Sequence, residues 1–213
     1  MSNEALIDAL VADLKPVWHL PRWARWAALA ALAALQVAAV LSIRGVRADM
    51  PMAMGHAPIW WKGGSLAIIV LISTVAAVRS FVPTDNARPG LRMLVPTVAV
   101  ALAIGWLIDA GSAGIAPVIA RLDWKNGLAC MGQIVLLSVP SIVVLGLMMH
   151  RGAATDPKAT ALAVGLAAAS WGAFVFVFNC PHDDPLYTAV WYSISIWAIA
   201  CIVRAVLPLL TRW

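Results

Sequence analysis

The sequence is poor in charged residues, and this scarcity decides its broad class. Only 12% of the 213 residues are charged, whereas 62% are apolar, and the mean hydropathy is +0.88. Soluble domains carry about 25% charged residues, so this chain has too little polar surface to cover a core in water. A soluble globular domain is therefore excluded, and we expect the chain to lie in a lipid bilayer.

Other shortages exclude specific functions. The three cysteines include no C-x-x-C motif, which excludes a thioredoxin-like motif and a four-cysteine zinc site. No basic stripe with interleaved aromatic residues suggests direct nucleic-acid binding. The centres of the apolar runs contain no ionisable side chain, unlike most transporters and pumps; Gln36 is the most polar group of the first run. All histidines fall in predicted tails or loops, which opposes a bis-histidine haem site: His19, His56, His150 and His182.

The apolar residues fall into six runs of the length that a spanning helix needs, about 17 to 25 residues. Lys62 and Arg92 lie in the first turns of two runs, where we expect their side chains to reach the lipid headgroups. We therefore predict an all-α polytopic membrane protein, a bundle of six transmembrane helices. The predicted spans are Trp26–Ile43, Ile59–Val78, Leu91–Ile108, Leu128–Met149, Ala159–Phe178 and Leu186–Val203.

Two further patterns concern orientation and packing. Six spans place both termini on one side, and ten of the fifteen lysines and arginines fall on that side. The positive-inside rule therefore predicts cytoplasmic termini. The fifth run also carries small residues at helical spacing, which predicts close helix packing. These residues are Gly165, Ala168, Ala169 and Gly172.

Two cysteines are predicted to share the outer face. Cys130 lies at the start of the fourth span and Cys180 just after the fifth, whereas Cys201 lies at the opposite end. A nine-residue connection makes spans four and five adjacent antiparallel helices, so a disulfide is feasible if both side chains face inward. A helix N-terminus favours thiolate, which predicts Cys130 as the more reactive partner. The alternative is that buried cysteines serve as small apolar side chains.

The outer loops hold further candidate metal ligands. Met50, Met52, Met54 and His56 lie within seven residues, and His182 follows Cys180 closely. Together with thiolates, these ligands suit a soft ion such as Cu(I). Two alternatives stay open: the methionines are lipid-facing, and the acidic pair Asp183 and Asp184 belongs to a solvated loop.

The N-terminal segment, from Asn3 to Leu14, is predicted to form a short amphipathic helix. Its opposite face is acidic, which disfavours anionic lipid, so we expect the apolar face to bind a protein partner. The alternative is that this helix folds against its own bundle. The chain thus divides into a cytoplasmic segment, 1–25, and a six-helix domain, 26–213. The apolar face consists of Leu6, Ile7, Leu10, Val11 and Leu14.

Four segments resemble the NrsF-like family of integral-membrane anti-sigma factors, the negative regulators of extracytoplasmic-function sigma factors. The likeness extends nearly from end to end, and the two segments that carry cysteines are its most specific part. The four segments read LIDALVADLKPVWHLP, LACMGQIVLLSVPSIVVLGLMMHRGAATDP, GLAAASWGAFVFVFNCPHDDPLYTAVWY and LPLLTRW.

The resemblance implies a six-span, non-enzymatic protein of the bacterial inner membrane, with no obligatory cofactor. Its N-terminal segment is expected to hold an extracytoplasmic-function sigma factor, and Cys130 and Cys180 are expected to sense oxidative stress or a metal, copper or another heavy metal. The alternatives are a membrane thiol oxidoreductase, which generally needs a second dithiol, and a metal transporter.

Overall fold

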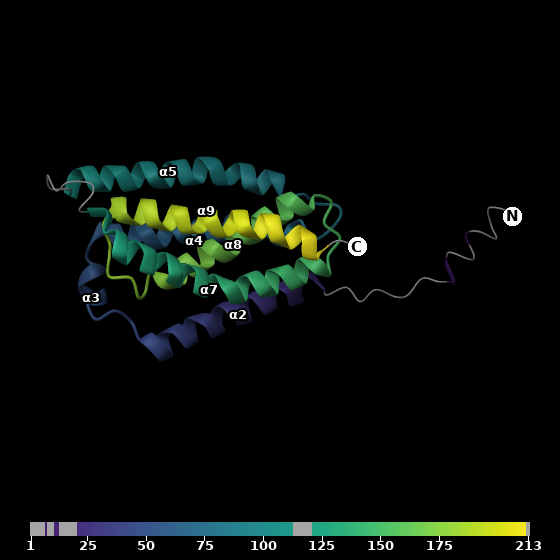
Figure 1. Ribbon diagram of the computed structural model, residues 1–213, viewed down its shortest axis with the longest axis horizontal. Helices are drawn as coiled ribbons and strands as arrows, with labels where there is room; N and C mark the ends of the chain where they lie inside the picture. The colour runs from purple at the N-terminus through teal and green to yellow at the C-terminus, as the bar shows by residue number, and fades with distance from the viewer. Residues whose placement is uncertain (1–6, 8–10, 13–20, 113–120, 212–213) are drawn as a thin grey trace.

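The fold is a bundle of long helices (Figure 1). The computed structural model describes residues 7, 11–12, 21–112 and 121–211, and these residues contain no β-strand. Six of the helices are long and apolar enough to cross a membrane, which confirms the predicted all-α fold with six spans. The helices are α2 (Arg22–Arg44), the short α3 (Met50–Ala53), α4 (Ala57–Arg79), α5 (Arg88–Ser112), α7 (Trp124–His150), α8 (Pro157–Phe176) and α9 (Pro185–Leu210).

Proline and aspartate define the starts of the last two helices. Pro157 and Pro185 stand at their first positions, and the carboxylates of Asp156 and Asp184 accept hydrogen bonds from free backbone N–H groups of the first turn. The fifth span ends at Phe176, two residues earlier than predicted. The sixth continues to Leu210, past the predicted end at Val203.

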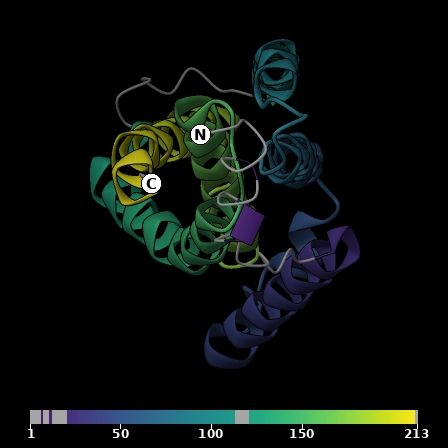
Figure 2. The same ribbon diagram turned by 90° about the vertical axis from the view of Figure 1, so that its right-hand side faces the viewer.

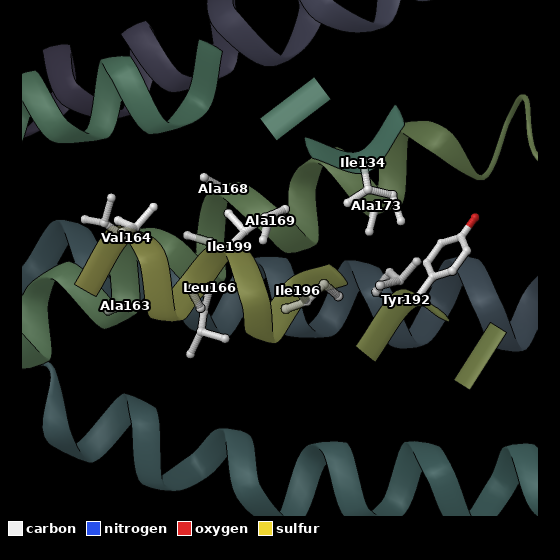
Figure 3. Close-up of a cluster of buried hydrophobic side chains, with 14 of the residues drawn as sticks. Ile134, Ala163, Val164, Leu166, Ala168, Ala169, Ala173, Tyr192, Ile196 and Ile199 are labelled. Atoms are coloured by element: carbon white, nitrogen blue, oxygen red, sulfur yellow. The ribbon is translucent and has the colours of Figure 1, made fainter. Parts of the chain in front are cut away.

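Helix α8 forms the centre of the bundle, between α4, α7 and α9. In its apolar stretch 72% of the residues are buried, against 11% in α2. A Cβ on Gly165 would lie 2.7 Å from Cα of Ala200, and one on Gly172 would lie 2.9 Å from the carbonyl oxygen of Ile134. Figure 3 shows Ala168, Ala169 and Ala173 in the same buried cluster. The predicted close packing of the small residues is therefore confirmed, and it involves α7 and α9.

Helix α2 lies at the edge of the bundle, as the end-on view shows (Figure 2). One polar cluster attaches its middle. Gln36 donates to the carbonyl oxygen of Leu137 (2.8 Å) and accepts from Ser141 (3.1 Å) and Trp171 (2.9 Å). Towards the start of α2, a cavity of about 240 Å³ separates Trp26 and its neighbours from α4, α7 and α8. Helix α2 is thus held mainly at its middle and near Gly45, where it ends. The end of the bundle that holds Gly45 is the one predicted to face outwards; we call it the outer end, and the opposite end the inner end.

Candidate functional site: a buried thiol pair at the outer end

The outer end of the bundle brings two thiols together. Cys130 lies in the second turn of α7, and Cys180 lies four residues after α8. Their Sγ atoms are 4.0 Å apart, both side chains are buried, and both cysteines are free thiols. The predicted meeting of these residues at one face is confirmed. Cys201 is exposed and lies in the opposite half of α9.

Tight packing between α7 and α9 positions the pair. The Trp191 ring fills the space that a Cβ on Gly127 would occupy, so only glycine lets α9 lie this close to α7. The Asp184 carboxylate caps α9 by accepting from the Tyr187 N–H at 3.0 Å. The cap orients the first turn of α9, from which the Tyr187 hydroxyl donates to Cys130 Sγ at 3.2 Å. The His182 ring packs on Tyr187, with centroids 4.7 Å apart.

Lys62 is a member of this site, and its predicted position at the headgroups is wrong. Its side chain is fully buried, and its Nζ donates to the carbonyl oxygen of His182 at 2.9 Å. Cys180 Sγ contacts the same oxygen at 3.7 Å. Lys62 points inwards because the loop that follows Cys180 folds over the start of α4 and offers it a carbonyl and the nearby Asp183 carboxylate, 3.7 Å away. A buried ammonium needs such partners.

The segment after α2 is bound to the Cys180 loop by main chain and side chain. Gly45, with φ of 71°, ends α2, and its carbonyl oxygen accepts from Asn179 at 2.7 Å. The Arg47 N–H donates to the carbonyl of Phe178 at 3.2 Å. The Arg47 guanidinium donates to the carbonyl of Cys180 at 2.5 Å and to both Asp183 oxygens at 2.9 and 2.5 Å. The outer end of α2 is therefore joined directly to the residue that carries the thiol.

Neither Asp183 nor Asp184 is a freely solvated side chain, so that alternative for the acidic pair is wrong. Asp183 pairs with Arg47 and Lys62. Asp184 pairs with Arg121, which also binds Asp109. These ion pairs tie the loop before α9 to neighbouring parts of the outer end.

The charges in the site favour a thiolate on Cys180. The hydrogen bond with Cys130 and then the positive charge of Lys62 hold the pKa of Cys180 below its ordinary value, against the opposing effect of burial. The sequence predicted Cys130 as the thiolate from its position near a helix N-terminus. The hydrogen bond between the thiols and the full charge of Lys62 act against the sequence-based assignment to Cys130, which stays a prediction.

The other candidate metal ligands lie in different environments. Met50 is buried, whereas Met52, Met54 and His56 are exposed. Within the described ranges, no group of three or more histidine, cysteine or acidic residues is arranged to hold a metal ion. The two thiols are thus the closest pair of soft ligands in the site. The His182 ring contacts Tyr187, whose hydroxyl donates to Cys130.

The N-terminal apolar face is described only in part. Ile7 and Val11 are helical, and each is 57% exposed. Leu6, Leu10 and Leu14 lie outside the described residues. The predicted binding role of this face stays a prediction.

Comparison with known families decides the relationship. The family model described as the negative regulator of sigma F matches residues 10–213. The chain belongs to the NrsF family. This confirms the resemblance seen in the sequence. The family is one of negative regulators, and this chain has six helices that could cross a membrane.

The chain is also similar to a named anti-sigma factor. The anti-sigma-F factor NrsF of Caulobacter vibrioides (strain NA1000 / CB15N) is 28% identical over 169 residues, which cover 78% of each chain. No solved structure matches this chain.

The sequence did not identify Lys62, Arg47 or Tyr187 as site residues. A lysine six residues into an otherwise apolar helix is the one signal that could have indicated Lys62. Arg47 and Tyr187 carry no comparable signal, because their roles arise from the fold of the outer loops.

Proposed function

We propose that this chain is a membrane-bound anti-sigma factor that holds an extracytoplasmic-function sigma factor and releases it when Cys130 and Cys180 react. Membership of the NrsF family supports the regulatory role. The observation that carries the sensing role is the pair of free, buried thiols 4.0 Å apart at one end of the bundle. The bacterial inner membrane and the cytoplasmic termini are part of this proposal, and they rest on the charge bias of the loops.

The thiol pair suits two kinds of stress signal. Oxidation joins the two sulfur atoms, removes two electrons and releases the thiol protons, and an oxidant takes the electrons. Alternatively, both sulfurs donate electron pairs to one soft metal ion such as Cu(I). Their separation is close to that of two thiolates on one tetrahedral ion with metal–sulfur bonds of about 2.3 Å. In both reactions Cys180 loses its free thiolate charge.

Helix α2 offers a route from the sensor to the N-terminal segment. Its outer end is bound to the Cys180 loop through Gly45 and Arg47, and its inner end leads into residues 1–21. Between these ends, the Gln36 cluster is the main polar attachment. A displacement of the Cys180 loop would therefore tilt α2 about Gln36 and move its inner end, where the cavity of about 240 Å³ leaves room.

The sigma-binding role is tested with charged substitutions in the N-terminal segment. Leu10→Glu with Val11→Glu should release the sigma factor without any stress, because a docked apolar helix face cannot accommodate buried charge. Co-purification of the sigma factor with membranes measures the loss. Ala12→Glu is the matched control, since Ala12 is adjacent and exposed but lies off the predicted apolar face. Equal retention by both variants would refute the docking role.

The sensing role is tested by replacing both cysteines. Cys130→Ser with Cys180→Ser should retain the sigma factor and no longer release it on exposure to an oxidant or a soft metal. Cys201→Ser is the control and should respond like the unmodified chain, because Cys201 lies away from the pair. Constitutive release by the double variant would instead assign the thiols a structural role.

A further inference from the structure

Two cavities follow α2 and meet at Trp26. The first, of about 520 Å³, lies at the inner end, between the start of α2 and the end of α4. The second, of about 240 Å³, separates α2 from α4, α7 and α8. Both are lined by Trp26 and by successive turns of α4, so they lie end to end. We call the two together the α2 slot.

The deeper part of the slot, beyond Trp26, is apolar. Apart from Thr74 and Ser141, its lining side chains are alanine, valine, leucine and tryptophan. Arg25 and Ala33 line the two ends of the slot on α2, and the eight residues between these positions correspond to about 12 Å of helix. One leaflet contributes about 15 Å to the apolar core of a bilayer. The slot therefore has the lining and the length to hold much of one lipid chain.

The inner end of the slot is charged. It is lined by Arg25 and Arg79 and also by the carboxylate of Asp85. Arg25 is half-buried, whereas Arg79 and Asp85 are exposed. Within the described ranges neither arginine forms an ion pair, with Asp85 or with any other carboxylate. The inner end thus carries a net positive charge, and its two guanidinium groups have the donor geometry that suits a phosphate.

We propose that the α2 slot binds one anionic phospholipid. Its phosphate would lie between Arg25 and Arg79, and one of its acyl chains would pass Trp26 into the apolar part. This inference goes beyond the proposed function and does not depend on it, because it involves neither the thiols nor the sigma factor.

The two ends of the slot match the two ends of such a lipid. Basic pockets between membrane helices bind anionic headgroups, and tryptophan is favoured at the boundary between headgroups and chains. A free phosphate would occupy the charged end alone and leave the apolar walls without contacts, which is unfavourable. A lipid chain also exchanges with the bilayer, so it fills the slot without blocking the tilt of α2 proposed above.

The experiment titrates the full-length protein in detergent with phosphatidylglycerol, and native mass spectrometry measures the Kd of the first bound lipid. Arg25→Gln with Arg79→Gln should raise this Kd by about tenfold or more, because two charged donors to the phosphate are lost. Arg92→Gln with Arg204→Gln is the matched control. It removes two exposed arginines near the inner end that do not line the slot, so the Kd should stay unchanged.

A second pair of variants tests the apolar part and keeps every charge. Ala33→Phe puts a ring into the slot and should raise the Kd in the same way. Ala34→Phe is its control, since Ala34 is exposed and lies outside the slot. This pair also decides the matter if the arginine variant does not fold.

Three results would overturn the lipid site. Equal weakening by both arginine pairs would mean that phosphatidylglycerol binds the charged end of the bundle in general. An equal Kd for phosphatidylcholine, whose headgroup is neutral overall, would remove the role of the two arginines in selecting an anionic lipid. Displacement of phosphatidylglycerol by glycerol phosphate, which has no acyl chain, would show a site for a soluble phosphate instead.

Discussion

At the scale of single residues, the two thiols differ because of the groups around them. Cys180 Sγ lies 4.0 Å from Cys130 Sγ and 3.7 Å from the His182 carbonyl oxygen, which also accepts from Lys62. The hydrogen bond with Cys130 and the positive charge of Lys62 hold the pKa of Cys180 below its ordinary value in spite of burial. A thiolate is the nucleophile and the metal ligand, so we expect Cys180 to be the sulfur that reacts first.

The pH dependence of the thiol signal tests this assignment. Free cysteine titrates near pH 8.5, about 1.5 units above neutral pH, whereas Cys180 should remain thiolate well below pH 8.5. Ultraviolet thiolate absorbance of a Cys201→Ser chain should therefore persist as the pH falls. Cys180→Ser should abolish the low-pH signal, and Cys130→Ser should move it to higher pH. Survival of the low-pH signal in Cys180→Ser would assign it to Cys130 instead.

Sequence patterns predicted the meeting of the cysteines but not their unequal chemistry. Helix order and a short connection were enough to place Cys130 and Cys180 at one face. The burial of Lys62 depends on where the loop around His182 folds, and no local pattern encodes that position. The same holds for Arg47, whose partners Cys180 and Asp183 lie more than 130 residues away in the chain.

At the scale of helices, α2 combines firm attachment at two points with a gap near its start. Gln36 makes three hydrogen bonds within an apolar helix that could span a membrane, where an unpaired amide would be costly. Gln36→Leu should therefore loosen the middle of α2. We expect the thiols to oxidise normally while release of the sigma factor by oxidant falls several-fold, measured by co-purification.

Gln133→Leu is the matched control, because it removes an amide from α7 whose Oε1 has no partner in the described residues. An equal loss in both variants would argue against a specific attachment.

Helix α8 tests the packing of the bundle. Gly172→Leu would push a side chain into Ser138 and the carbonyl of Ile134, so it should destabilise the fold by about 1–3 kcal/mol or prevent assembly. Gly132→Leu, on α7, is the control, since a Cβ there meets no other atom within 4 Å. Thermal unfolding in detergent compares the two. The sequence predicted close packing of the small residues of α8. It did not predict that α8 packs on both sides and forms the centre of the bundle, because that depends on the arrangement of all six helices.

At the scale of the whole molecule, the thiol pair and the start of α2 lie at opposite ends of the bundle. Helix α2 has 23 residues, a length of about 35 Å, enough to cross the apolar core of a bilayer. The thiol pair lies at its outer end, joined through Arg47, whereas residues 1–21 precede its inner end. Under the proposed function, a signal from the thiols would therefore have to cross the membrane to act on a sigma factor.

The orientation of the chain is the prediction on which this transmembrane signal depends. Single cysteines are introduced into a chain whose own three cysteines are replaced by serine. Lys125→Cys, at the start of α7, should react with a membrane-impermeant maleimide on intact spheroplasts, because the loop bias directs this end outwards. Arg151→Cys, in the loop after α7, should react only after the membrane is permeabilised. Both positions are exposed, so a difference in labelling reports the side of the membrane rather than burial. The reverse pattern would put the thiols in the cytoplasm and the N-terminal segment outside, where no sigma factor can reach it.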